Sequence, residues 1–349
     1  MMLAQAARDL GARTVALDPA PDAPAAAVTD RFVAGAYDDP EALEELCRQS
    51  DVVTYEFENV PAETLRRLDG KYDIKQGIAP LLDSQDRLRE KTRAREAGLA
   101  VPRFECASTA AELRRAVREV GFPCVFKTRR LGYDGHGQAV MRTEADLPKA
   151  EVFMPVEGIV EEFVDFDAEA SIVMVGDAEN LVTFPIGRNA HREGILDITS
   201  VPARLGGDIE RRIEEQSRRF MLRSGYRGIL AIEYFIRGDE ILFNEMAPRP
   251  HNSGHYTMEG CDASQFDALA RWLLGMSPTQ PRLLGPTVMK NILGRDLEAA
   301  RALEAEGREG VHVHLYGKSE SRPKRKMGHV TFTDTTPEDY AARWAGRFS

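Results

Sequence analysis

Short apolar runs alternate with amphipathic stretches along the first part of the chain. The pattern predicts strands over residues 14–18 and 51–60 and helices over residues 1–10, 40–49 and 62–68. Helices that alternate with strands are typical of a parallel sheet covered by helices. The sequence therefore predicts an α/β fold for this region.

Longer elements follow in the middle of the chain. The pattern predicts helices over 84–99, 108–120, 208–224 and 262–274, and strands over 122–127, 139–141, 158–164, 169–176, 228–236 and 240–246. Ser84 is the expected N-cap of the first of these helices, and Gly98 lies near its C-terminal end. After Pro281 and Pro286 the pattern changes to short strands, in VMKNIL, VHVHLYGK and GHVTFT, which indicates a small closing β domain.

The composition is that of a globular protein with two or three domains. The 349 residues are 43% apolar and 29% charged, and the formal net charge is −10. Such values are ordinary for a globular chain of this length. An acidic chain is not a general nucleic-acid binder, although a local basic cluster can still bind a small anion.

Cysteine spacing and hydropathy point to a cytoplasmic protein. The four cysteines are far apart and form no C-x-x-C pair, so neither a zinc ribbon nor a disulfide framework is indicated. No apolar run reaches the length that spans a bilayer, and the N-terminus lacks the pattern of a secretory signal. We therefore expect neither a membrane partner nor a nucleic-acid partner.

A predicted hairpin carries a pair of carboxylates. GILAIEYFIRGDEILFNEM contains two strands joined by a tight turn at Gly238 and Asp239. A three-residue loop would place Glu233 opposite Glu245, whereas a two- or four-residue loop would place it opposite Asn244. Two like charges that face each other destabilise a sheet unless a cation neutralises them, and oxygen ligands suit Mg²⁺. The alternative is a pair of solvated glutamates at the edge of the sheet.

The segment that follows this hairpin favours the metal site over the alternative. NEMAPRPHNSGH places Asn244 and Glu245 just before Arg249, His251 and Asn252. A fold by itself does not require a guanidinium and imidazoles at the end of an apolar strand. A site for a metal and anionic ligands can use side chains of these types.

A lysine and a glycine-rich loop form a second candidate site. Lys127 ends the apolar strand FPCVF, and GYDGHGQ follows at residues 132–138. Glycines allow the backbone to approach phosphates closely, and the lysine adds a positive charge. The loop leads back to a strand, so it is neither a Walker loop nor a Rossmann fingerprint. The alternative is a plain glycine-rich hairpin, although a plain turn does not need Tyr133 and Asp134.

The segment EEFVDFDAE, residues 161–169, carries a related but less specific pattern. A strand that ends, bends and resumes exposes backbone groups that can pair with an adenine edge. Glu169 could accept hydrogen bonds from ribose hydroxyls. The alternative is a bend on the protein surface.

Together these motifs resemble the ATP-grasp superfamily, in which two α/β subdomains grip ATP. YEFENV, QDRLREK, GYDGHGQ, NEMAPRPHNSGH, HLYGK and RKMGH are similar, in order and spacing, to the 5-(carboxyamino)imidazole ribonucleotide synthase family of that superfamily. The resemblance covers nearly the whole chain. It implies an α/β ATP-grasp fold with an N-terminal parallel α/β (pre-ATP-grasp) domain over 1–83, an ATP-grasp domain over 84–276 with a lid over about 103–166, and a C-terminal β domain over 277–349.

The resemblance also implies a reaction. Enzymes of this family are ATP-dependent carbon–nitrogen ligases of purine biosynthesis that use Mg²⁺. They carboxylate 5-aminoimidazole ribonucleotide (AIR) with bicarbonate through carboxyphosphate, giving N5-carboxyaminoimidazole ribonucleotide, ADP and phosphate. A homodimer is the implied assembly. Asp134, on a loop able to close over the site, is the expected base for the amine of AIR, with Arg249 and Lys318 as further catalytic residues.

The resemblance assigns the remaining site residues to three groups. ATP would contact Arg87, Lys127, Gly132, Tyr133, Asp134, Gly135, His136, Gly137, Gln138, Glu161, Glu162, Phe163, Val164, Glu169, His191, Asn244 and Glu245, and Mg²⁺ would be held by Glu233 and Glu245. AIR would contact Tyr133, Asp134, one of Glu56 or Glu58, Lys318 and Arg325, while Arg249, His251 and Asn252 would surround bicarbonate.

Two features depart from the family pattern. The family begins with a strand and a GGGQLGR-like turn that contacts the ribose phosphate, whereas this chain starts at the residue expected after that turn. His136 stands where the family more often has lysine or arginine, and near pH 7 a histidine binds phosphate less strongly. The alternatives are another ATP-grasp ligase, of the formate-dependent glycinamide ribonucleotide transformylase type, or a truncated, non-catalytic nucleotide-binding protein. HLYGK and RKMGH argue against the former, and intact Lys127, Glu233 and Glu245 argue against the latter.

Overall fold

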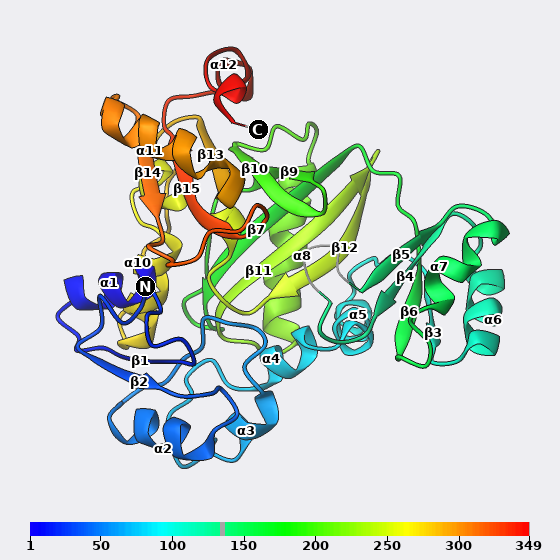
Figure 1. The fold of residues 1–349 in the computed structure, drawn as a ribbon, viewed down its shortest axis with the longest axis horizontal. Coiled ribbons are helices and arrows are strands. Elements are labelled where there is room, and N and C mark those ends of the chain that lie inside the picture. The colour runs from blue at the N-terminus through cyan, green and yellow to red at the C-terminus, as the bar shows by residue number, and fades with distance from the viewer. Residues whose placement is uncertain (133–136, 349) are drawn as a thin grey trace.

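The computed structural model describes residues 1–132 and 137–348, which form three sheets of two, four and nine strands. The largest sheet occupies the middle of the molecule, and the N-terminal region and the four-stranded sheet lie at different sides of it (Figure 1). Within these two ranges no helix has both the length and the apolar character needed to cross a membrane.

The N-terminal region contains a small parallel sheet, as the alternating pattern predicts. Strands β1 (Val15–Asp18) and β2 (Arg31–Ala34) pair in parallel. The helices here are α1 (Met2–Asp9), α2 (Pro40–Arg48), α3 (Ala62–Arg66) and α4 (Ala79–Ser84). The predicted strand over 51–60 is wrong, because only Val53 forms a bridge, with Ile74. Val53, Tyr55 and Val60 are nevertheless buried, so their apolar pattern reflects packing and not a ladder of hydrogen bonds.

The four-stranded sheet forms a separate layer with its own core. Its strands, in spatial order, are β3 (Phe104–Ala107), β6 (Gly158–Glu162), β4 (Cys124–Thr128) and β5 (Gln138–Met141). Helices α6 (Ala110–Val120) and α7 (Leu147–Glu151) lie beside this sheet (Figure 1). They supply apolar side chains to its core. Lys127 therefore lies near the end of a central strand of this sheet, just before the glycine-rich segment.

The nine-stranded sheet joins the middle and the C-terminal part of the chain. Its main path runs through β12 (Glu240–Ala247), β11 (Gly228–Arg237), β7 (Ala168–Gly176), β9 (Gly187–Arg192), β10 (Ile195–Val201), β13 (Thr287–Leu293), β15 (Lys326–Phe332) and β14 (Val311–Leu315), and β8 (Val182–Thr183) pairs with β7 off this path. The three C-terminal strands thus continue the central sheet. Strand β12 lies at its edge.

Helices cover both faces of this sheet. Helix α8 (Ile209–Arg223) packs on one face with Leu230 and Ile232 of β11, whereas α10 (Gln265–Leu273) packs with Ile229 and Ala231 on the other. Alternate residues of one strand therefore fill two cores, as a strand buried on both faces requires. The remaining helices are α5 (Arg87–Glu96), α9 (Thr257–Gly260), α11 (Leu297–Glu306) and α12 (Pro337–Arg343).

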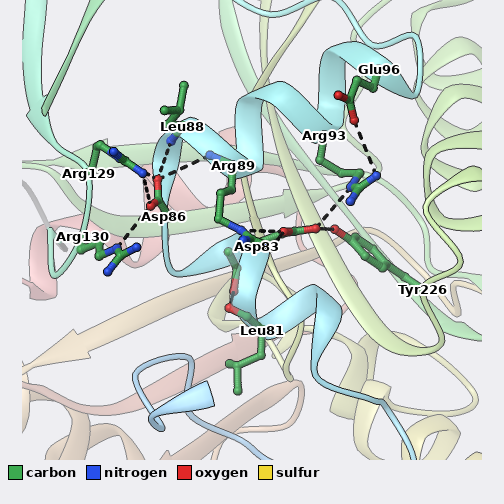
Figure 2. Close-up of polar contacts among 11 residues, drawn as sticks. Leu81, Asp83, Asp86, Leu88, Arg89, Arg93, Glu96, Arg129, Arg130 and Tyr226 are labelled. Atoms are coloured by element: carbon green, nitrogen blue, oxygen red, sulfur yellow. Dashed lines mark hydrogen bonds and ion pairs between the residues drawn. The ribbon is translucent and has the colours of Figure 1, made fainter. Parts of the chain in front are cut away.

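Helix α5 begins at a different residue from the one the sequence predicts. Ser84 is the last residue of α4, and Asp86 is the N-cap of α5, where its carboxylate accepts hydrogen bonds from the backbone N–H groups of Leu88 and Arg89. Figure 2 shows that the same carboxylate also binds Arg129. Aspartate caps a helix as well as serine does, and only aspartate can also pair with an arginine.

Candidate active site

The structure fixes the register of β11 and β12, which the loop length alone leaves open. Its turn has two residues, and the ladder pairs Arg237 with Glu240 and continues to Tyr234 opposite Phe243. A β-bulge then shifts the pairing by one residue, so that Glu233 lies opposite Glu245. The carboxylate pair therefore forms through a bulge and not through the three-residue loop that the sequence considers.

The two carboxylates have opposite tendencies to ionise. Burial and the charge of Glu245 raise the pKa of Glu233 to about 8. Burial opposes ionisation of Glu245 as well, but the positive charges of Arg87 and Lys127 outweigh it and lower its pKa. The Arg87 Nη1 atom lies 3.4 Å from Glu245 Oε2. Near neutral pH Glu233 therefore favours its protonated form and Glu245 its ionised form.

Two lysines surround a buried carboxylate beside this pair. Lys127 Nζ lies 2.5 Å from Glu161 Oε2, and Lys91 contacts the other carboxylate oxygen. Burial opposes ionisation of Glu161, but the charges of Lys127 and Lys91 outweigh it and lower its pKa to about 2. Glu161 is therefore a permanent counter-ion for both lysines.

Lys91 is a functional candidate that the sequence reasoning missed. Its side chain is fully buried, and its Nζ also donates to the backbone carbonyl of Asn244. The sequence could have pointed to Lys91 through its place in QDRLREK. It lies four residues after Arg87, and residues four apart share one face of a helix. The same helical turn carries Glu90, a second buried charged residue without an assigned role.

Glu169 and His191 form an ion pair across strands β7 and β9. The Glu169 carboxylate contacts His191 Nδ1. Burial disfavours the charged imidazole, but the Glu169 hydrogen bond and the nearby Glu233 carboxylate raise the pKa of His191 to about 9. The imidazole therefore carries a positive charge at neutral pH, as a phosphate-binding group would.

The segment after β12 places a histidine beside the carboxylate pair and an arginine beside Glu58. Arg249 contacts Glu58, and burial lowers the pKa of its guanidinium to about 10. His251 Nε2 lies 3.4 Å from Glu233 Oε1, and its Nδ1 lies 2.8 Å from Ser253 Oγ. Burial holds the pKa of His251 well below its usual range, so this imidazole is neutral.

Asn252 follows His251 in the same segment. Asn252 begins the short 3-10 turn Asn252–Gly254, and its buried Nδ2 has no hydrogen-bond partner among residues 1–132 and 137–348.

The sequence leaves open whether Glu56 or Glu58 reaches the site. Glu58 contacts Arg249 directly, whereas Glu56 lies 3.9 Å from the N-terminal amino group of Met1.

Lys318 and Arg325 lie after β14 and before β15, facing the N-terminal region. Lys318 Nζ donates to the carbonyl of Lys326 at 2.8 Å, and Arg325 Nη1 donates to the carbonyl of Glu320 at 2.7 Å. Burial, followed by the charges of Arg325 and Lys326, lowers the pKa of Lys318. The hydroxyl of Ser319 donates to Asp22, which joins this basic loop to the N-terminal region.

The remaining predicted ATP residues lie in and around the four-stranded sheet. Glu162 pairs with Arg103 and Arg237, Phe163 follows β6, and Val164 is buried. Gly137 has a φ of +74°, and a Cβ atom there would lie 2.5 Å from Thr128 Oγ1, so this position requires glycine. Gly132 precedes Tyr133, Asp134, Gly135 and His136, which are outside the described residues, and Gln138 pairs with Lys127.

Three family models match consecutive parts of the chain. The ribonucleotide synthetase preATP-grasp domain matches residues 1–81, the ATP-grasp domain matches residues 92–266, and the phosphoribosylaminoimidazole carboxylase C-terminal domain matches residues 287–343. The fold and the site are therefore those of an ATP-grasp ligase.

Comparison with individual relatives narrows the assignment from the ATP-grasp class to one family. The N5-carboxyaminoimidazole ribonucleotide synthase of Staphylococcus haemolyticus is 40% identical over 99% of this chain and 94% of its own. The crystal structure of the Staphylococcus aureus synthetase with ADP has a TM-score of 0.95 at 37% identity and covers 100% of this chain and 94% of that one. The Aspergillus clavatus enzyme in complex with ADP and 5-aminoimidazole ribonucleotide has a TM-score of 0.87 at 27% identity, over 99% and 94% of the two chains. The chain belongs to the N5-carboxyaminoimidazole ribonucleotide synthase family.

Proposed function

We propose that this ATP-dependent ligase of purine biosynthesis, which converts AIR to N5-carboxyaminoimidazole ribonucleotide, takes its carboxyl group from bicarbonate and requires Mg²⁺. The observation that carries the proposal is the convergence of three features at one end of the central sheet. These are the Glu233–Glu245 pair, the Lys127–Arg87 cations and the Arg249–His251 segment.

The nucleotide would bind between the four-stranded sheet and the central sheet. Lys127, Arg87 and the charged imidazole of His191 would neutralise the phosphates of ATP, while Glu169 would meet the ribose and residues 161–164 the adenine. The other groups of the nucleotide site would be residues 132–138 and Asn244–Glu245. Phosphoryl transfer depends mainly on positioning and charge neutralisation, which is what these groups supply.

The donor set fits a magnesium ion. Glu233 and Glu245, which lie opposite each other in the hairpin, would be the protein ligands. Mg²⁺ usually keeps water and phosphate oxygens as its other ligands, so two carboxylates suffice. When bound, the ion neutralises the charge that develops on the transferred phosphoryl group. A divalent cation would also relieve the repulsion between the two facing carboxylates.

Bicarbonate would bind between Arg249, His251 and Asn252. An oxygen of bicarbonate attacks the γ-phosphorus of ATP, and the bond to ADP breaks, which gives carboxyphosphate. The exocyclic amine of AIR then forms a bond to the carboxyl carbon, directly or after release of CO₂, and phosphate leaves. Arg249 would stabilise the negative charge on the oxygens in both steps.

AIR would bind between the N-terminal region and the C-terminal basic loop. Lys318 and Arg325 would contact its anionic end, and Glu58 or Glu56 its imidazole side. The amine loses one proton as it is carboxylated, and we assign this proton to the carboxylate of Asp134, with Tyr133 beside the substrate.

ADP release tests this proposal. The purified chain is supplied with Mg-ATP and ¹³C-bicarbonate, with and without AIR, and ADP and the labelled carbamate are measured. AIR should stimulate ADP release, and the label should appear in the product. A folded chain that binds ATP but releases no additional ADP with AIR would contradict the assignment.

We also propose that the enzyme acts in the cytoplasm as a homodimer. The four cysteines are all free, which fits a reducing compartment. Light scattering coupled to size-exclusion chromatography measures the assembly directly, and a mass of one chain of 38.8 kDa would contradict the dimer.

A further inference from the structure

The bulge in β12 decides whether Glu233 and Glu245 can act together. Without the bulge, the two-residue turn would continue the ladder so that Glu233 faced Asn244 and Glu245 faced Ile232. Ile232 belongs to the core beneath helix α8, so a carboxylate there would be buried among apolar side chains. With the bulge, Met246 enters that core instead.

A bulge leaves backbone groups unpaired, and on an edge strand these groups have no second neighbour in the sheet. Helix α5 and the segment after it supply the missing partners. The backbone N–H of Met246 donates to Glu90 Oε1 at 2.6 Å, and the carbonyl of Asn244 accepts from Lys91 Nζ at 3.0 Å. Further along the same edge, the N–H of Phe243 donates to the carbonyl of Ala100 at 2.8 Å.

The two α5 side chains therefore hold the backbone on both sides of Glu245. Glu90 is 2% exposed and Lys91 is 0% exposed. Charged side chains are rarely buried so completely, and packing alone would be served by apolar residues of similar size. Their polar ends meet two backbone groups on the open edge of β12 that flank Glu245, and Lys91 also pairs with Glu161.

We propose that Glu90 and Lys91 are positioning residues that hold the bulge of β12 and thereby keep the Glu245 carboxylate opposite Glu233. They act through the backbone of residues 244–246 and do not themselves contact the metal. The inference rests on the proposed binding of a divalent cation by Glu233 and Glu245.

Manganese binding in the presence of ADP tests the proposal, with Mn²⁺ as a spectroscopic substitute for Mg²⁺. Free Mn²⁺ is measured by electron paramagnetic resonance for Glu90→Leu, Glu90→Gln and Lys91→Met. Glu90→Leu and Lys91→Met should weaken Mn²⁺ binding about tenfold or more, as loss of outer-shell support usually does. Glu90→Gln keeps an acceptor for the Met246 N–H and should stay within about twofold of the unmodified chain. Glu96→Leu, an exposed change on the same helix, should have no effect.

Further controls separate this inference from the metal assignment and from general damage. Glu245→Gln should abolish Mn²⁺ binding, and failure to do so would overturn the proposed metal site itself. The thermal midpoint shows whether a variant is folded, and ADP affinity in EDTA shows whether Lys91→Met, which also removes a partner of Glu161, has altered the nucleotide site. If Glu245→Gln loses the ion but folded Glu90→Leu and Lys91→Met bind it normally, the positioning role is wrong.

The register itself supplies a second measurement. In a crystal structure of Glu90→Leu, or of Lys91→Met if the first variant does not fold, Glu233 should no longer lie opposite Glu245. An unchanged bulge together with normal Mn²⁺ affinity would overturn the inference.

Discussion

Replacing Asp86 separates its two roles, as the cap of α5 and as the counter-ion of Arg129. Its side chain is 2% exposed and caps two backbone N–H groups. It also accepts from Arg129 Nε at 3.0 Å and Nη2 at 2.6 Å, and from the more exposed Arg130 (Figure 2). Burial opposes ionisation of this carboxyl, but Arg129 outweighs it and lowers the pKa, so the charge is present at neutral pH.

The expected loss in the free energy of unfolding follows from these contacts. Asparagine caps a helix about as well as aspartate, so Asp86→Asn keeps the cap but loses the charge pair. Arg129 is 20% exposed and also pairs with Glu157, so we expect a loss of about 2 kcal/mol and not the full cost of breaking a buried pair. Asp86→Ala removes the cap too and should cost about 1 kcal/mol more. Arg130 is 65% exposed and contributes little.

Urea unfolding followed by circular dichroism measures these differences. A double-mutant cycle of Asp86→Asn with Arg129→Met should give a coupling energy of about 2 kcal/mol. The matched control is the exposed pair Arg114–Glu151, for which about 0–1 kcal/mol is expected. Equal coupling in the two cycles, or equal stability of Asp86→Asn and the unmodified chain, would refute the reasoning.

Three further predictions concern the nucleotide site and the core. Lys127→Met should raise the KM for ATP about tenfold or more in steady-state kinetics, because it removes the buried charge that we propose neutralises the phosphates, and an unchanged KM would exclude Lys127 from the nucleotide site. His191 has its pKa raised to about 9, so its contribution to stability is complete below about pH 6.5 and is lost as the pH rises through about 9. Glu233, with its pKa raised to about 8, loses a proton in the same range, so the His191 contribution is the difference between the unmodified chain and His191→Asn. Urea titrations of the two ligand-free chains should differ in this loss by at most about 3 kcal/mol, and equal slopes would show that His191 does not cause it. Tyr226→Phe removes a hydrogen bond of 2.6 Å to the buried Asp83 carboxylate and should lower the free energy of unfolding by about 1–2 kcal/mol, whereas a thermal midpoint equal to that of the unmodified chain would show that the bond contributes nothing.

Most element types, and the family to which the chain belongs, could be predicted from the sequence alone. The alternating pattern of the N-terminal region predicts the parallel pair β1 and β2, and the hairpin of β11 and β12 follows from its apolar runs and its Gly238–Asp239 turn. These features depend on residues a few positions apart, so local preferences suffice to predict them. The family motifs likewise consist of contiguous residues.

Only the tertiary structure decided the register, the cap and the buried counter-ions. The loop length of the hairpin allowed two registers, and the choice rests on Glu90 and Lys91, which are 156 and 153 residues away from their backbone partners. The prediction of a strand over 51–60 was wrong because the apolar side chains of this segment pack in a core, while its backbone forms only the single bridge of Val53 with Ile74. Burial and pairing depend on which distant segments of the chain come into contact. A charged side chain that the sequence predicts to be exposed becomes buried, and needs a polar partner, when a second segment covers it.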